Sequence, residues 1–169
     1  MYDPKFTHDH LMECQETRAL LKDKFPGAWL DEPDRVEWNH AGLNCMAIRH
    51  SRHFHWCGYV GLPPHHPDYG KDYDDVDVDV HGGLTYGEKC VGHVCHQPLT
   101  GEPDELFWFG FDCAHWSDLQ PGMVAILKDL SMPMLTDFNL ERFSTYRDID
   151  FVKRETNQLA EHFAKSLAK

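Results

Sequence analysis

The sequence predicts an α+β domain in which an antiparallel sheet of about five strands carries the N- and C-terminal helices packed on it. Apolar residues recur at helical spacing near both ends of the chain, while the middle alternates or runs apolar as strands do. The connections between these strand-like runs are short, which favours antiparallel pairing because parallel strands need a long crossover. At 169 residues, a single domain over 1–169 is expected.

Two helices are predicted from apolar stripes at the ends of the chain. The first covers residues 8–25, with Thr7 as its N-cap and Pro26 and Gly27 ending it. The last begins near Thr145 and Asp148 and runs to the C-terminus. Their apolar stripes consist of Leu11, Cys14, Leu21 and Phe25 in the first helix, and Ile149, Val152, Leu159, Phe163 and Leu167 in the last. A short helix is also expected at 123–130.

Strand-like patterns occupy the middle of the chain, at residues 35–38, 43–49, 54–62, 76–80 and 105–113. Val76, Val78 and Val80 alternate with aspartates, so the valines should face inward and the aspartates outward. Residues 105–113 are almost continuously apolar, which predicts a central strand covered on both faces. Glycines at 58 and 61 indicate a bulge or a close approach of another backbone.

Charge and composition limit the classes of partner. The formal net charge of −12 and the pI near 5.4 should repel duplex nucleic acid and anionic membranes. No apolar run of about 18 residues is present to span a bilayer, and the first residues do not form an apolar signal segment. A cytoplasmic protein is expected, so the six cysteines should be reduced thiols. The sequence leaves open a homo-oligomer.

The sharpest candidate site combines His81, Asp112, His115 and Asp118. His81 follows one predicted strand and Asp112 ends another, so both side chains could reach the same edge of the sheet. Imidazoles and carboxylates supply the nitrogen and oxygen ligands of Zn²⁺ or Mn²⁺, and carboxylates those of Mg²⁺. We therefore expect His81, Asp112 and His115 as catalytic residues, and all four residues as ligands if a divalent metal binds. In the alternative interpretation, Asp112 and His115 only hydrogen-bond the loop backbone.

Other reactive clusters have plainer interpretations. Asp75, Asp77 and Asp79 are explained by a solvated strand face, and the acidic run lacks the glycine and glutamate of an EF-hand loop. The tight spacing of Cys90, His93, Cys95 and His96 does not suit one tetrahedral zinc ion, which favours a loop with free thiols and solvated histidines. His53 and His55 are expected on one face of a strand, half-exposed.

Several segments together resemble a family of small, uncharacterised proteins from bacteriophages and prophages. They are Gly58-Tyr-Val-Gly-Leu-Pro, His66-Pro-Asp-Tyr-Gly-Lys-Asp-Tyr-Asp-Asp75, Val80-His-Gly-Gly-Leu-Thr-Tyr86, Cys95-His96 and Phe109-Gly-Phe-Asp-Cys-Ala-His115. The resemblance covers about residues 55–122 and resumes at 146–160, and the family brings no catalytic assignment. It implies work in the bacterial cytosol, where accessory phage proteins of this size often counter host defence.

Three functions remain open on these observations. The first is a hydrolase, such as a phosphodiesterase, that cleaves a small nucleotide signal of host defence. The second is a non-catalytic sponge that sequesters such a nucleotide, and the third is a protein-binding inhibitor with an acidic surface. The motif region is rich in Asp and His, whereas a sponge for phosphate should be lined with Arg and Lys, so the hydrolase is favoured. The expected substrate-binding residues are Tyr59, His66, Tyr69, Lys71, Asp72, Gly82, Gly83, Tyr86 and Trp116.

Overall fold

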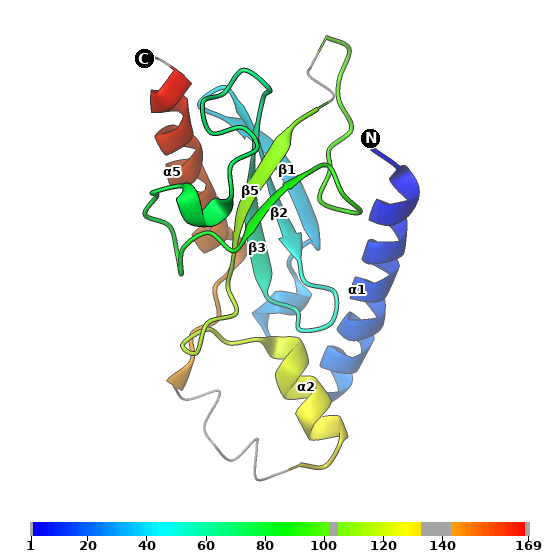
Figure 1. Cartoon of the computed structure of the whole chain (residues 1–169). Helices are drawn as coiled ribbons and strands as arrows, with labels where there is room; N and C mark the ends of the chain where they lie inside the picture. Colours follow the sequence, from blue (N-terminus) through cyan, green and yellow to red (C-terminus); the bar gives the residue numbers. More distant parts are fainter. Residues whose placement is uncertain (1, 102–104, 133–142, 168–169) are drawn as a thin grey trace.

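The computed structural model of the chain describes residues 2–101, 105–132 and 143–167. It has the predicted α+β fold, with a helix near each end and an antiparallel sheet of five strands between them (Figure 1). In chain order, the elements are α1 (Pro4–Lys24), the 3-10 turn η1 (Ala28–Leu30), β1 (Arg35–His40), β2 (Leu43–Arg49), β3 (Trp56–Leu62), the 3-10 turn η2 (Tyr73–Asp75), β4 (Tyr86–Lys89), β5 (Phe107–Asp112), α2 (Pro121–Asp129) and α5 (Ile149–Leu167).

The sheet has the strand order β1-β2-β3-β5-β4, and every neighbouring pair is antiparallel. β5 is an inner strand, as its apolar sequence predicts, because β3 and β4 flank it on either side. Phe107, Phe109 and Phe111 of β5 point to the core shared with α5. Trp108 belongs to a separate cluster that includes Met46 and Tyr59. Both faces of β5 are therefore covered.

The two long helices lie on opposite sides of the sheet (Figure 1). α5 packs on β2 and β3, and its close approach leaves no room for a side chain at Gly58, where a Cβ would collide with Thr156 and Phe111. α1 packs instead against α2, with a core that also takes in Phe54 from the connection between β2 and β3. This cluster buries Cys14, Leu21 and Phe25 of the apolar stripe predicted for the first helix, whereas Leu11 is half-buried outside it.

Three local predictions are wrong at the level of individual residues. No strand forms at 76–80, and the fourth strand is instead Tyr86–Lys89. The predicted directions of the side chains do hold, because the valines at 76, 78 and 80 face the core and the aspartates between them face solvent. α1 begins at Pro4 with Asp3 as its N-cap, so Thr7 lies inside the helix. Leu167 is 39 % exposed and does not join the buried stripe of α5.

A buried ionic network fixes the segment that leads into α5. Arg49 is fully buried and pairs with Glu32 at 2.7 Å, while Glu32 also accepts hydrogen bonds from Tyr146, Trp56 and the backbone of Ile149. Burial alone raises the pKa of Glu32, but the hydrogen bonds of Tyr146 and Arg49 bring it below its ordinary value. Arg49 is therefore a structural residue.

Across residues 2–101, 105–132 and 143–167, none of the helices has both the length and the apolar character needed to cross a membrane.

Candidate functional site

Asp118 is the centre of the candidate site. Its side chain is fully buried in the segment that follows β5. One of its carboxylate oxygens, Oδ2, lies 2.8 Å from Nε2 of His81 and 3.1 Å from Nδ1 of His115, and it accepts a hydrogen bond from the backbone N–H of His115. The other oxygen, Oδ1, accepts a hydrogen bond from Nε of Arg147 at 2.9 Å. Three of the four residues predicted for the site thus come together.

Each partner of Asp118 comes from a different part of the chain. A turn between the carbonyl of His115 and the N–H of Asp118 places the His115 ring beside the carboxylate. A two-stranded bridge between Asp118 and Thr145 brings Arg147 to its other side. The third partner, His81, is held by a hydrogen bond from its backbone N–H to Glu155 of α5.

Gly82 shapes the contact between the two imidazoles. Its φ is +69°, and the His115 ring lies where a side chain at this position would be. The rings of His81 and His115 meet edge to face with centroids 5.1 Å apart, and Phe151 packs against the other side of His81. The glycine after His81 therefore allows the second ring to approach.

The charges around Asp118 favour its ionised form. Burial alone raises the pKa of this carboxyl, but hydrogen bonds from His81, Arg147 and the His115 backbone together hold the pKa below its usual range. The carboxylate is therefore negatively charged near neutral pH. It can orient both imidazole rings, and it can serve as a metal ligand.

The donor set fits a divalent transition metal. His81, His115 and Asp118 each offer one ligand atom, and these atoms all lie within 4.8 Å of one another. Ligand atoms in a tetrahedral zinc site are about 3.3 Å apart, for bonds of about 2.0–2.1 Å. The separations of 2.8 and 3.1 Å from Oδ2 of Asp118 are near this value. Arg147 opposes a metal at Oδ1, because its cation already occupies that oxygen.

Solvent can reach the site through the partners of Asp118. The side chains of His81, His115 and Arg147 are 16 %, 30 % and 26 % exposed. A cavity of about 50 Å³ is lined in part by Asp118 and by residues at the start of α2. Trp116, the residue after His115, is 89 % exposed and offers an open aromatic surface.

Asp112 does not join this group, which corrects its predicted role as a ligand. Its Oδ1 accepts a hydrogen bond from the backbone N–H of Ala114 at 3.0 Å, as the alternative interpretation of the sequence proposed. Asp112 faces away from the α5 core because side chains alternate along β5, and Phe111 takes the position on that face.

The residues predicted to bind substrate do not line one pocket. His66 is buried and contacts the carbonyl of Phe163 in α5, while Tyr69 packs on Phe107. Tyr59 is buried on the opposite face of the sheet, where it contacts Tyr86. Two further residues act within their own loop, since Lys71 pairs with Asp68 and Asp72 caps η2. Gly82 and Trp116 remain beside the site, and Gly83 follows Gly82.

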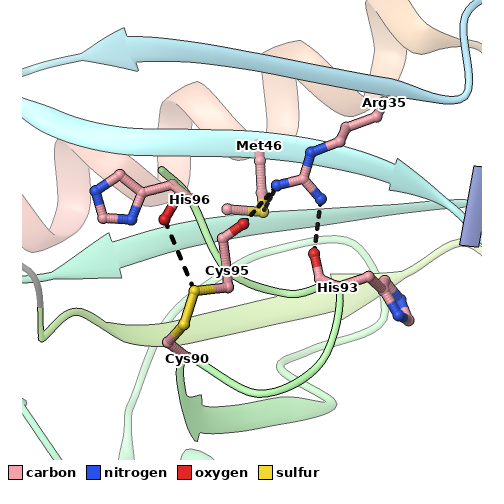
Figure 2. Close-up of a disulfide and its surroundings, with 6 residues drawn as sticks. All are labelled: Arg35, Met46, Cys90, His93, Cys95 and His96. Carbon is pink, nitrogen blue, oxygen red and sulfur yellow. Dashed lines mark hydrogen bonds between the residues drawn. A yellow bond between two sulfur atoms is a disulfide. The ribbon is translucent and has the colours of Figure 1, made fainter. Parts of the chain in front are cut away.

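The segment 90–96 contains a disulfide, so the expectation of reduced thiols is wrong for two of the six cysteines. Figure 2 shows the bond between Cys90 and Cys95, whose Cα atoms are 4.6 Å apart. Arg35 of β1 donates to the carbonyls of His93 and Cys95, both at 2.6 Å, and so holds the loop against the sheet (Figure 2). The other four cysteines, Cys14, Cys45, Cys57 and Cys113, are free thiols.

A larger hollow lies elsewhere, between the β1–β2 edge and the loop after the disulfide. Its volume is about 310 Å³, and its lining includes Trp38, Asn44, His96, Leu99 and Trp108. His81, His115 and Arg147, the partners of Asp118, do not line it. A small ligand bound in this hollow would therefore be remote from these residues. We therefore place the candidate reactive centre at Asp118.

Sequence reasoning missed two residues of the site, Arg147 and Glu155. Both come from the C-terminal part of the chain, and no motif there pointed to chemistry. Comparisons with known proteins found no match among family models, curated proteins or solved structures. Only the residues of the site itself bear on what the protein does.

Proposed function

We propose that this protein is a hydrolase of a small nucleotide, with His81, His115 and Asp118 as its catalytic centre. The observation that carries the proposal is the single carboxylate oxygen of Asp118 that lies within 2.8 and 3.1 Å of two imidazole nitrogens. Such an arrangement orients two proton carriers around one buried anion. Groups of this kind are typical of active sites and add little to stability on their own.

The two histidines can divide the work of hydrolysis. One imidazole would take a proton from an attacking water molecule, and the other would give a proton to the oxygen of the leaving group. Asp118 would orient the rings and stabilise the positive charge that forms on them. If a divalent ion such as Zn²⁺ or Mn²⁺ is bound by the same three residues, it would supply a Lewis acid and a more acidic water.

The substrate class is supported by the groups at the entrance. Arg147 places a guanidinium, the side chain best suited to a phosphate, directly beside Asp118. The exposed ring of Trp116 offers a surface on which a base could stack. The resemblance to small phage proteins extends the proposal to a nucleotide signal of host defence in the bacterial cytosol.

The test is turnover of a panel of cyclic and linear nucleotides by the purified full chain, with and without chelator. Wild type should form products, and His81→Ala or His115→Ala should lower the rate by at least ~100-fold. The matched control is His65→Ala, an exposed histidine in the loop after β3. Loss of products with chelator would identify a metallohydrolase. Products that persist with chelator would indicate acid–base catalysis by the side chains without a metal.

Two results would contradict the hydrolase. Intact nucleotide recovered from a tight complex, with no products, would favour a sponge. An absence of both binding and turnover across the panel would remove both nucleotide functions and leave a protein-binding inhibitor. Equal turnover by wild type and both histidine variants would place the chemistry elsewhere in the molecule.

A further inference from the structure

A second group of histidines lies in the connection between β2 and β3. His50, His53 and His55 each present a ring nitrogen, and these three atoms lie within 4.8 Å of one another. The three rings form a triangle, because the His50 centroid lies 4.9 Å from that of His53 and 4.8 Å from that of His55, and the His53 and His55 centroids are 6.3 Å apart. None of the three takes part in the site around Asp118. His53 and His55 are not on a strand face, as the sequence had suggested, but lie with His50 in a compact turn.

Backbone hydrogen bonds hold this turn in one conformation. The N–H of His50 donates to the carbonyl of His55 at 2.8 Å, and the N–H of Phe54 donates to the carbonyl of His50 at 2.9 Å. The N–H of His53 donates to Nδ1 of His50 at 3.1 Å, which leaves Nε2 of His50 as its ligand nitrogen. From outside, Gly122 at the start of α2 donates to the carbonyl of His53 and packs too closely for any side chain.

Phe54 shows that the turn is maintained against a local conformational cost. Its φ is +65°, in the left-handed region that a bulky L residue rarely adopts. The side chain is fully buried, with the guanidinium of Arg49 4.5 Å and that of Arg18 5.2 Å from its ring centroid. Strained backbone of this kind persists where the surroundings impose it, and it is enriched at functional sites.

The buried imidazole of His55 is an independent indication of a ligand. The residue is only 5 % exposed, and its Nδ1 has no hydrogen-bond partner among the residues that the structure describes. A buried polar atom without a partner is energetically costly. A cation bound by the three rings would provide the His55 ring with an interaction partner. Burial also lowers the pKa of His55 to about 3, so the ring is neutral near pH 7, the form that binds metals.

We propose that His50, His53 and His55 form a binding site for a transition-metal ion, with Zn²⁺ as the representative ligand. Three neutral nitrogen donors suit Zn²⁺, Cu²⁺, Ni²⁺ or Co²⁺, whereas Mg²⁺ and Ca²⁺ prefer oxygen. His50 is exposed, so the ion can enter from solvent and keep an open fourth position for water. The carboxylate of Asp112 lies close enough for its charge to act on His50 and His55, which favours a bound cation.

The site can be tested by titrating the chelator-stripped full chain with Zn²⁺ in a calorimeter. Because His81, His115 and Asp118 could also bind Zn²⁺, each titration is repeated in a His115→Gln background. His53→Gln removes one ligand from a half-exposed position. It should weaken one Zn²⁺ site by at least ~100-fold in both backgrounds, since loss of an outer-shell partner alone costs about 10–100-fold. The control variant His65→Gln should bind as wild type does.

Two further measurements keep the proposal open to refutation if His53→Gln folds poorly. His50→Gln changes an exposed ligand and should give the same loss of affinity. Histidine ring ¹⁵N resonances of the wild-type protein should shift for His50, His53 and His55 when Zn²⁺ is added. Unchanged Zn²⁺ affinity in both variants, shifts confined to His81 and His115, or no binding up to ~1 mM Zn²⁺ would each overturn the proposal.

Discussion

Replacing Gly82 by alanine should displace the His115 ring at little cost to the fold. A Cβ at this position would overlap Cε1 and Nε2 of His115 and lie 2.7 Å from Nδ1. We expect the imidazole to rotate away and to lose its 3.1 Å contact with Oδ2 of Asp118. The left-handed φ of +69° penalises alanine by ~1–2 kcal/mol, while the less flexible unfolded chain recovers roughly 0.4–1 kcal/mol, so the net loss is about 1 kcal/mol.

Gly83→Ala is the matched control for this prediction. Gly83 has a similar φ of +83°, but nothing lies within 4 Å of an added Cβ. Denaturant unfolding should therefore show a loss of about 1 kcal/mol in both variants. Only Gly82→Ala should lower the rate of hydrolysis, by ~100-fold or more. In the same variant, the ring ¹⁵N resonances of His115 should shift, because the ring no longer contacts Asp118. Equal activity and equal His115 signals in the two variants would refute the placement of His115 over Gly82.

Three further predictions concern stability. Phe163 is fully buried in the α5 core, so Phe163→Ala should lower the free energy of unfolding by ~3–5 kcal/mol. Leu167→Ala, at the exposed end of the same helix, should lower it by less than ~0.5 kcal/mol. Equal losses in the two variants would contradict the packing of α5. Burial and the stacked ring of His10 lower the pKa of His93 to about 4. As the pH falls below about 6.5, His93 is therefore protonated in the unfolded chain before it is protonated in the folded one. The contribution of neutral His93 to the free energy of unfolding is complete above that pH. It should be lost between about pH 6.5 and pH 4, by up to roughly 1 kcal/mol per pH unit. His93→Gln should flatten this part of the stability curve, and an unchanged slope would exclude His93 as its source. Reduction of Cys90–Cys95 should lower stability by about 2 kcal/mol, as estimated for a loop this short, and a Cys90→Ser, Cys95→Ser double variant should be insensitive to reductant.

The fold was predictable because its signals are local and periodic. The inner position of β5 follows from a run of aromatic residues that only a doubly covered strand can bury. The error at 76–80 has the same origin: valine and aspartate alternate there as in a strand, but periodicity reports which side faces the core and says nothing of hydrogen-bonding partners. The edge position next to β5 goes instead to Tyr86–Lys89, a run with no comparable alternation.

The site was predictable only where its residues cluster in sequence. His115 and Asp118 lie one turn apart, and His81 stood out because it follows the alternating valines and aspartates and precedes two glycines. Arg147 reaches Asp118 through a bridge between distant segments, at Asp118 and Thr145, which no spacing rule anticipates. His53 and His55 were misplaced because the left-handed φ of Phe54, unusual for a bulky residue, turns the chain where a strand was expected.

Burial of charge alone does not distinguish the function of Asp118 from that of Glu32, because both carboxylates bind a guanidinium and several other donors. The difference lies in what solvent can reach. Arg49, the partner of Glu32, is fully buried, and that network ties the end of β2 to the start of α5. The side chains of the partners of Asp118 are instead between 16 % and 30 % exposed, and two of them are imidazole rings. A buried ion pair gives little net stability, so an anion that holds two reachable imidazoles is better explained by chemistry than by folding.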